Sequence, residues 1–91
     1  MIRQVVSVEN RLGLHARAAA KLVRMASQFS SEVYLSREGA EQAIDSKSIL
    51  GVLMLAASQG TRLVVSISGL DEAEAGEAIR RLFEEKFGED Y

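Results

Sequence analysis

The chain has 91 residues, no cysteine, 11 basic and 13 acidic side chains, and a formal net charge of −2. This length predicts a single domain over residues 1–91, and the lack of cysteine excludes disulfides, thiolate chemistry and thiolate metal sites. The charge balance argues against nucleic-acid binding, and the longest apolar run, 49–57, is too short to insert into a membrane.

The first half of the chain shows two strand patterns separated by a helix pattern. Residues 2–8 are rich in β-branched side chains and predict a strand, which turn residues then end. Apolar side chains recur at intervals of three and four from 16 to about 29, and this spacing predicts a helix. Alternation over 32–37, a turn signal and a short segment at 42–44 predict a hairpin.

The second half begins with a short helix and a strand. Ser46 and Ser48 are candidate N-caps for a helix over residues 49–57. The segment 61–68 alternates between apolar and polar side chains, which predicts a half-buried strand. Its inward-facing residues are expected to be Leu63, Val65 and Ile67.

A last helix opens at Asp71, with Glu74 forming a pair similar to a capping box, and Gly88 is a plausible stop. The element order is therefore β-α-β-β-α-β-α. Since the strands are half-buried, helices should cover one face of the sheet in a two-layer α+β sandwich. The helix is expected to bury Ala75, Ala78, Ile79, Leu82, Phe83 and Phe87.

The only histidine, His15, stands where the loop pattern gives way to the first helix pattern. A group at a helix start faces free N–H donors and the positive end of the dipole, which favours an anion such as phosphate. Arg17, in the first turn of the same helix, adds a positively charged guanidinium with paired N–H donors. Gly13 permits a tight backbone turn just before His15. Because imidazole is nucleophilic near neutral pH, His15 is a candidate phosphoryl carrier.

The same residues allow other interpretations of His15. A lone histidine can be a surface or capping residue without chemistry. A metal site lacks a second histidine or any cysteine. No G-x-S-x-G elbow, P-loop or G-x-G-x-x-G motif occurs, so hydrolase and nucleotide-binding functions have no support.

The short helix is apolar nearly all round, and a small two-layer domain cannot bury it on every side. Unless a flanking helix covers it, part of its surface should be exposed and dock partners. The segment 1–30 carries five basic residues and one acid, which adds a local positive field. The residues expected on the exposed surface of the short helix are Ile49, Leu50, Leu53 and Met54.

Two motifs together resemble a known family. Gly13-Leu14-His15-Ala16-Arg17 and Lys47-Ser48-Ile49-Leu50-Gly51-Val52-Leu53, in a chain of this length and element order, are similar to the histidine-containing phosphocarrier HPr family of the bacterial phosphoenolpyruvate-dependent phosphotransferase system. The resemblance covers the chain from about residue 5 to 87. It implies an open-faced β-sandwich, with three helices on one face of a four-stranded antiparallel sheet.

The resemblance also implies roles. His15 would accept a phosphoryl group from enzyme I and pass it to an enzyme IIA domain, with Arg17 stabilising the phosphohistidine. Ser48 aligns with the serine that HPr kinase/phosphorylase modifies in many relatives, and a phosphate there would obstruct enzyme I. The docking surface would comprise Ala16, Ala20, Arg24, Lys47, Ile49, Leu50, Leu53 and Met54.

The chain departs from the family at Ala18, where proline is usual, and this restores an N–H donor at a cost of about 0.4–1 kcal/mol. The stretches 17–22 and 53–55 are also similar to the nitrogen-regulatory branch, so the branch stays open. A second hypothesis is a regulatory binding module governed by Ser48, with His15 incidental. Under either hypothesis we expect a cytoplasmic monomer without cofactor, signal peptide or enzymatic activity of its own.

Overall fold

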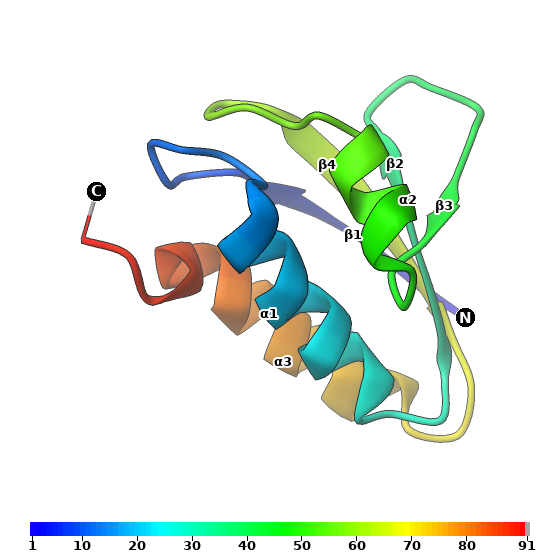
Figure 1. Ribbon diagram of the computed structural model, residues 1–91. Coiled ribbons are helices and arrows are strands. Elements are labelled where there is room, and N and C mark those ends of the chain that lie inside the picture. Colours follow the sequence, from blue (N-terminus) through cyan, green and yellow to red (C-terminus); the bar gives the residue numbers. More distant parts are fainter. Residues whose placement is uncertain (91) are drawn as a thin grey trace.

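The computed structural model describes residues 1–90 and forms a four-stranded antiparallel sheet with three α-helices on one face (Figure 1). The element order and the open-faced sandwich predicted above are confirmed. None of the helices within residues 1–90 has the length and apolarity that a membrane crossing needs. The elements are β1 (Ile2–Ser7), α1 (Ala16–Ser27), β2 (Glu32–Arg37), β3 (Ile44–Asp45), α2 (Ile49–Met54), β4 (Arg62–Ser68), α3 (Glu72–Glu84) and the 3₁₀ turn η1 (Lys86–Gly88).

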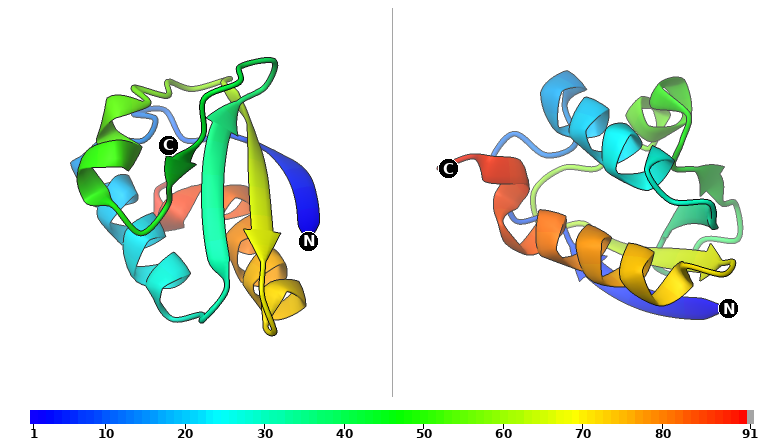
Figure 2. Two further views of the ribbon diagram at one scale, coloured as in Figure 1. Left: turned by 90° about the vertical axis from the view of Figure 1, so that its right-hand side faces the viewer. Right: turned by 90° about the horizontal axis from the view of Figure 1, so that it is seen from below.

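The sheet has the strand order β1-β4-β2-β3, so that the last strand in sequence lies between the first two. All three pairings are antiparallel. Leu63, Val65 and Ile67 of β4 are fully buried, as their alternation predicted, because side chains two apart in a strand face the same side. The helices lie on that side (Figure 2).

The core is closed by the contact between α1 and α3, which lie side by side under the sheet (Figure 2). Phe83 of α3 packs edge-on against Phe87 of η1, with ring centroids 4.9 Å apart. Both rings are buried, and such pairs add roughly 0.5–1.5 kcal/mol beyond the burial of their area. The predicted stripe of α3 is therefore largely the buried face of the helix.

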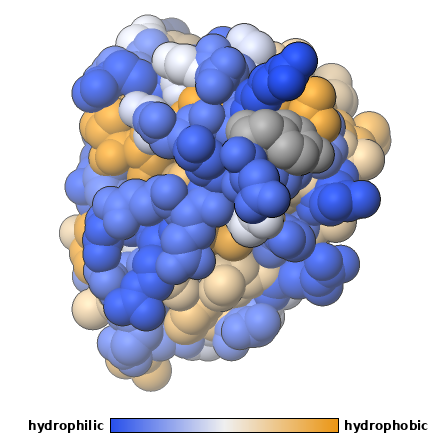
Figure 3. Space-filling view, turned by 90° about the vertical axis from the view of Figure 1, so that its left-hand side faces the viewer, coloured by the Kyte–Doolittle hydropathy of each residue, from blue (hydrophilic) through white to orange (hydrophobic). Residues whose placement is uncertain are grey.

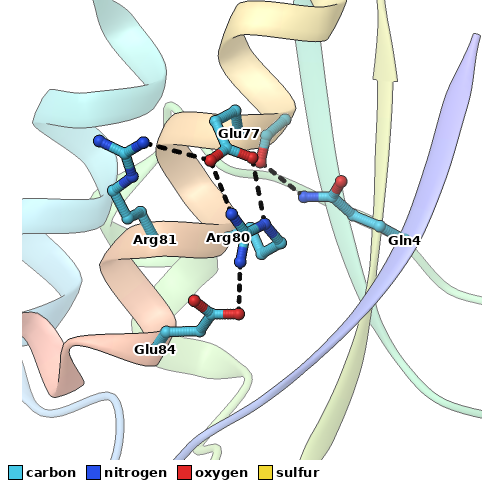
Figure 4. Close-up of polar contacts among 6 residues, drawn as sticks. Gln4, Glu77, Arg80, Arg81 and Glu84 are labelled. Carbon is cyan, nitrogen blue, oxygen red and sulfur yellow. Dashed lines mark hydrogen bonds and ion pairs between the residues drawn. The ribbon is translucent and has the colours of Figure 1, made fainter.

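Helix α3 approaches β1 closely at Gly76, and Figure 4 shows the Gln4 side chain of β1 directed toward this helix. The Gln4 side-chain amide donates to the Gly76 carbonyl at 2.8 Å, and a Cβ on Gly76 would come within 3.2 Å of Gln4 Oε1. The low helix propensity of glycine is thus offset by a close packing contact. On the solvent side, where ion pairs contribute little, lie Glu77, Arg80, Arg81 and Glu84.

The predicted capping box at the start of α3 is wrong. Asp71 occupies the N-cap position but makes no side-chain bond to its own helix. Its carboxylate instead accepts from the N–H groups of Ser30 and Ser31, both at 2.9 Å, and from the Ser31 hydroxyl. These donors lower the pKa of Asp71 to about 2. A tertiary contact with the α1–β2 connection therefore replaces the local cap.

Four boundaries also differ from the prediction, and one of them is the end of α3, which lies at Glu84 instead of Gly88. Helix α2 stops at Met54 instead of residue 57, because Ala56 takes a left-handed φ of 50° and the Ala57 carbonyl turns to accept the Leu14 N–H at 2.9 Å. The segment after α2 is thereby tied to the loop before α1. Strand β3 is confined to Ile44–Asp45, and α1 ends at Ser27.

Candidate functional site

His15 is the N-cap residue of α1, with an extended backbone of φ −73° and ψ 179°. Helical bonding begins where the Ala19 N–H donates to the His15 carbonyl at 2.8 Å. The N–H groups of Ala16, Arg17 and Ala18 have no intrahelical acceptor, as is general for a first helical turn. The imidazole is 28% exposed. A partly open ring thus stands beside free N–H donors at the positive end of a helix dipole.

The loop before His15 is held by backbone contacts. Gly13 has a left-handed φ of 69°, and its N–H donates to the Asn10 carbonyl at 3.2 Å. A Cβ on Gly13 would lie 2.5 Å from the Ala57 carbonyl oxygen, which already accepts the Leu14 N–H. The tight turn that the sequence predicted at Gly13 is therefore also a close approach between two backbone segments.

The C-terminal segment reaches this loop, which sequence reasoning missed. Glu89 Oε2 lies 2.5 Å from His15 Nε2, and Glu89 Oε1 accepts from the Asn10 side-chain amide at 3.0 Å. The Glu89 side chain is only 4% exposed. No local pattern joins residues 74 positions apart, and the acidic C-terminal composition was the only available signal.

The Glu89 carboxylate is buried, which by itself raises its pKa. Hydrogen bonds from His15 and Asn10 and the nearby charge of Arg17 lower the pKa by more than burial raises it, so the net shift is downward. The group facing the ring is therefore a carboxylate, which can only accept. His15 Nε2 accordingly donates to Glu89, and Nδ1 is the ring nitrogen with a free lone pair. Arg17 is exposed in the first turn of α1, close enough to influence this carboxylate.

Helix α2 presents an uncovered apolar surface. Only Val52 of this helix is buried. Helix α1 packs against α2 but leaves its other apolar side chains largely exposed, so within residues 1–90 the alternative interpretation is not supported. Seen from the left-hand side of Figure 1, the surface is mostly hydrophilic, with hydrophobic areas toward both the left and the right edge of the view (Figure 3). The exposed fractions are 43% for Ile49, 66% for Leu50, 38% for Leu53 and 75% for Met54; these four residues are the α2 patch.

The other predicted docking residues differ in accessibility. Ala16 and Arg24 are exposed, and Ala20 is half-buried. Lys47 is half-buried and its ammonium donates to the Phe29 carbonyl at 2.9 Å, so this charge is engaged within the fold. Sequence reasoning also missed the exposed Leu12 in the loop before His15, an apolar residue in a segment treated only as a turn.

Of the two candidate capping serines, Ser48 caps α2 and Ser46 does not. Ser48 Oγ accepts the Gly51 N–H at 3.1 Å. Ser46 is fully buried, and its hydroxyl has no hydrogen-bond partner within the described part of the chain. Ser48 therefore stands at the start of α2, next to the first residue of the α2 patch.

Comparison with known proteins places this arrangement among phosphocarriers. Residues 2–85 match the family described as "PTS HPr component phosphorylation site". The chain is 51% identical over 90 residues to the phosphocarrier protein HPr of Xylella fastidiosa, covering 99% of each chain. It is 45% identical over 86 residues to the phosphocarrier protein NPr of Proteus mirabilis, covering 93% of each. A crystal structure of HPr from Thermoanaerobacter tengcongensis superposes with a TM-score of 0.93 at 40% identity, covering 100% of each chain.

Proposed function

Because the chain belongs to the HPr family of phosphotransferase-system phosphocarriers, we propose that it accepts a phosphoryl group on His15 from phosphorylated enzyme I and passes it to an enzyme IIA domain. The observation that carries the proposal is the position of the partly exposed imidazole at the start of α1, beside free N–H groups. In this proposal the chain is a substrate of its partner enzymes.

The same geometry supports Nδ1 as the atom that carries the phosphoryl group. His15 Nε2 is occupied by Glu89 at 2.5 Å, which leaves the Nδ1 lone pair free for attack. A phosphoryl group close to the helix start would meet the first-turn N–H groups and the Arg17 guanidinium, both suited to a dianion. The phosphorylated ring leaves as neutral imidazole when the group moves on, so the bond is readily formed and readily broken.

The α2 patch is proposed as the surface that both partners use. Its four exposed apolar side chains project from one short helix, and exposed patches of this kind mark protein-binding surfaces. Arg17 and Arg24 on α1 are exposed and would steer an acidic partner face toward His15. The segment after α2 is held next to the His15 loop by the Leu14 N–H, which donates to the Ala57 carbonyl at 2.9 Å.

The function is tested by intact-protein mass after incubation with enzyme I, Mg²⁺ and phosphoenolpyruvate. The wild-type protein should gain one acid-labile phosphoryl group. His15→Ala should gain none and keep its circular-dichroism spectrum, because the N-cap side chain makes no capping bond to α1. Uptake by His15→Ala would contradict the assignment of His15. No uptake by the wild type, with an authentic HPr phosphorylated in parallel, would contradict the carrier function.

We also propose that Ser48 is a regulatory phosphorylation site, as the resemblance to the family implies. Its hydroxyl lies at the start of α2 and next to Ile49 of the α2 patch. A phosphate there would bring about −2 charge to a surface that otherwise docks through apolar contacts. Ser48→Asp should therefore weaken binding to enzyme I in a titration, while Ser48→Ala should not. Equal binding by Ser48→Asp and wild type would remove the regulatory role.

A further inference from the structure

Beyond the carrier role of His15, on which this inference rests, we propose that Glu89 is a positioning residue that holds the proton of the imidazole on Nε2 and so keeps Nδ1 ready to accept the phosphoryl group. The contact is short, with Glu89 Oε2 2.5 Å from His15 Nε2. The carboxylate is 4% exposed, although Glu89 follows η1, the last helical turn. A solvated surface glutamate would not be held in this way.

Asn10 fixes which oxygen of Glu89 faces the ring. Its side-chain NH₂ group donates to the Gly13 carbonyl at 2.7 Å and to Glu89 Oε1 at 3.0 Å. Asn10 is fully buried, and its side-chain oxygen Oδ1 has no hydrogen-bond partner within residues 1–90. Turning the amide over would point that oxygen at two acceptors, so only one orientation satisfies the hydrogen bonds. Glu89 is thus clamped between Asn10 and His15.

A left-handed backbone turn before Glu89 places this residue next to the His15 loop. Lys86 and Phe87 both have a left-handed φ of 57°, a region that residues with a side chain seldom occupy. The bend is retained because the Phe87 ring is buried against Phe83. The Lys21 ammonium of α1 also donates to the Phe87 carbonyl at 2.6 Å. This turn carries the chain from the end of α3 to the His15 loop.

The chemistry of transfer explains what the carboxylate does. The Nδ1 lone pair forms the bond to phosphorus, and the bond between phosphorus and the donor breaks with its electron pair staying on the donor. The proton remains on Nε2, so the ring gains a positive charge as the new bond forms. Glu89 accepts that Nε2–H and faces this charge, which stabilises the transition state and the phosphorylated ring. Dephosphorylation runs the same steps backward.

This arrangement makes E89Q a sharper test than E89A. Asn10 must still donate to the Gly13 carbonyl, so its NH₂ group will take the oxygen of the amide that E89Q introduces. The NH₂ group of that amide then faces His15 Nε2 and can only donate to it. The imidazole proton is forced to Nδ1, the nitrogen that should attack. In E89A no side chain binds His15 Nε2, which would instead bind water, so neither tautomer is imposed.

The chain has one histidine, so its ring nitrogens can be observed without overlap in a long-range ¹H–¹⁵N spectrum of the uniformly labelled protein. We expect the Nε2–H tautomer in the wild type, a mixture in E89A and the Nδ1–H tautomer in E89Q. Initial rates of phosphoryl transfer from phosphorylated enzyme I should fall in the same order. The wrong tautomer of a catalytic histidine costs up to about 10⁴-fold, and we expect a loss of roughly 10²-fold for E89Q.

D90N is the matched control, because it removes the same charge from the next residue, which is exposed; it should match the wild type in both measurements. A wild-type tautomer or an unchanged transfer rate in E89Q would overturn the proposal, and so would E89A transferring more slowly than E89Q. The tautomer measurement needs no partner. A wild type that takes up no phosphoryl group would therefore refute the carrier function, while the spectra would still decide whether Glu89 sets the proton position.

Discussion

Leu50→Glu is expected to lower the rate of phosphoryl transfer from enzyme I by about 10²-fold when the carrier is well below its KM, without unfolding the protein. Leu50 is 66% exposed, so the fold loses little when it is replaced. In the docked complex, however, the carboxylate would be buried among apolar side chains. Losing a central apolar anchor costs on the order of 2–4 kcal/mol, and each 1.4 kcal/mol corresponds to about tenfold in affinity.

The measurement is the initial rate of transfer as a function of carrier concentration. The apparent KM should rise, while the rate at saturation should change little, because His15 and its surroundings are untouched. Leu70→Glu is the control, since Leu70 is fully exposed and lies after β4, outside the α2 patch. A normal KM for Leu50→Glu, or an equal rise for Leu70→Glu, would show that the α2 patch is not the docking surface.

Gly13→Ala is expected to destabilise the fold by about 2–5 kcal/mol, because it combines left-handed backbone strain with steric overlap. Gly13 has a φ of 69°, and the added Cβ would lie 2.5 Å from the Ala57 carbonyl oxygen and 3.0 Å from Ser58 Cα. Both neighbours are backbone atoms and cannot rotate away as a side chain would. A domain of this size is stable by only about 5–15 kcal/mol.

Thermal unfolding followed by circular dichroism measures this effect, and at about 4–8 °C per kcal/mol the Tm should fall by at least about 8 °C. Gly39→Ala separates the two causes. Gly39 has a φ of 87° with nothing within 4 Å of an added Cβ, so it carries the backbone strain alone, roughly 1–2 kcal/mol. Equal losses at the two positions would mean that the contact with Ala57 is unimportant.

The local patterns of the sequence predicted most of the fold. Strict alternation over residues 61–68 identified β4 and its buried side chains, and spacing of three and four identified α1 and α3. The histidine at the boundary between a loop and a helix pattern placed His15 at the start of α1 without any knowledge of the sheet. Each of these inferences depends on residues within about one or two turns of each other.

The most consequential errors and omissions involve contacts between distant segments. Asp71 could not be told from an ordinary helix cap, because its true partners lie some 40 positions earlier, in the connection between α1 and β2. The early end of α2 follows from a hydrogen bond between Ala57 and Leu14. Ser46 and Ser48 were equivalent as candidate caps until the fold buried one of them.

The sequence alone determined the element order, the inward faces of the strands and the position of the only histidine at a helix start. These features follow from backbone sterics and from the periodicity of apolar side chains, which act over a few residues. Only the tertiary structure decided that Glu89 is the partner of His15 and that Asn10 holds it there. The pairing of Glu89 with His15 depends on a buried aromatic pair and a left-handed turn, which bring Glu89 back to the loop before α1. No local pattern encodes a hydrogen bond across 74 positions.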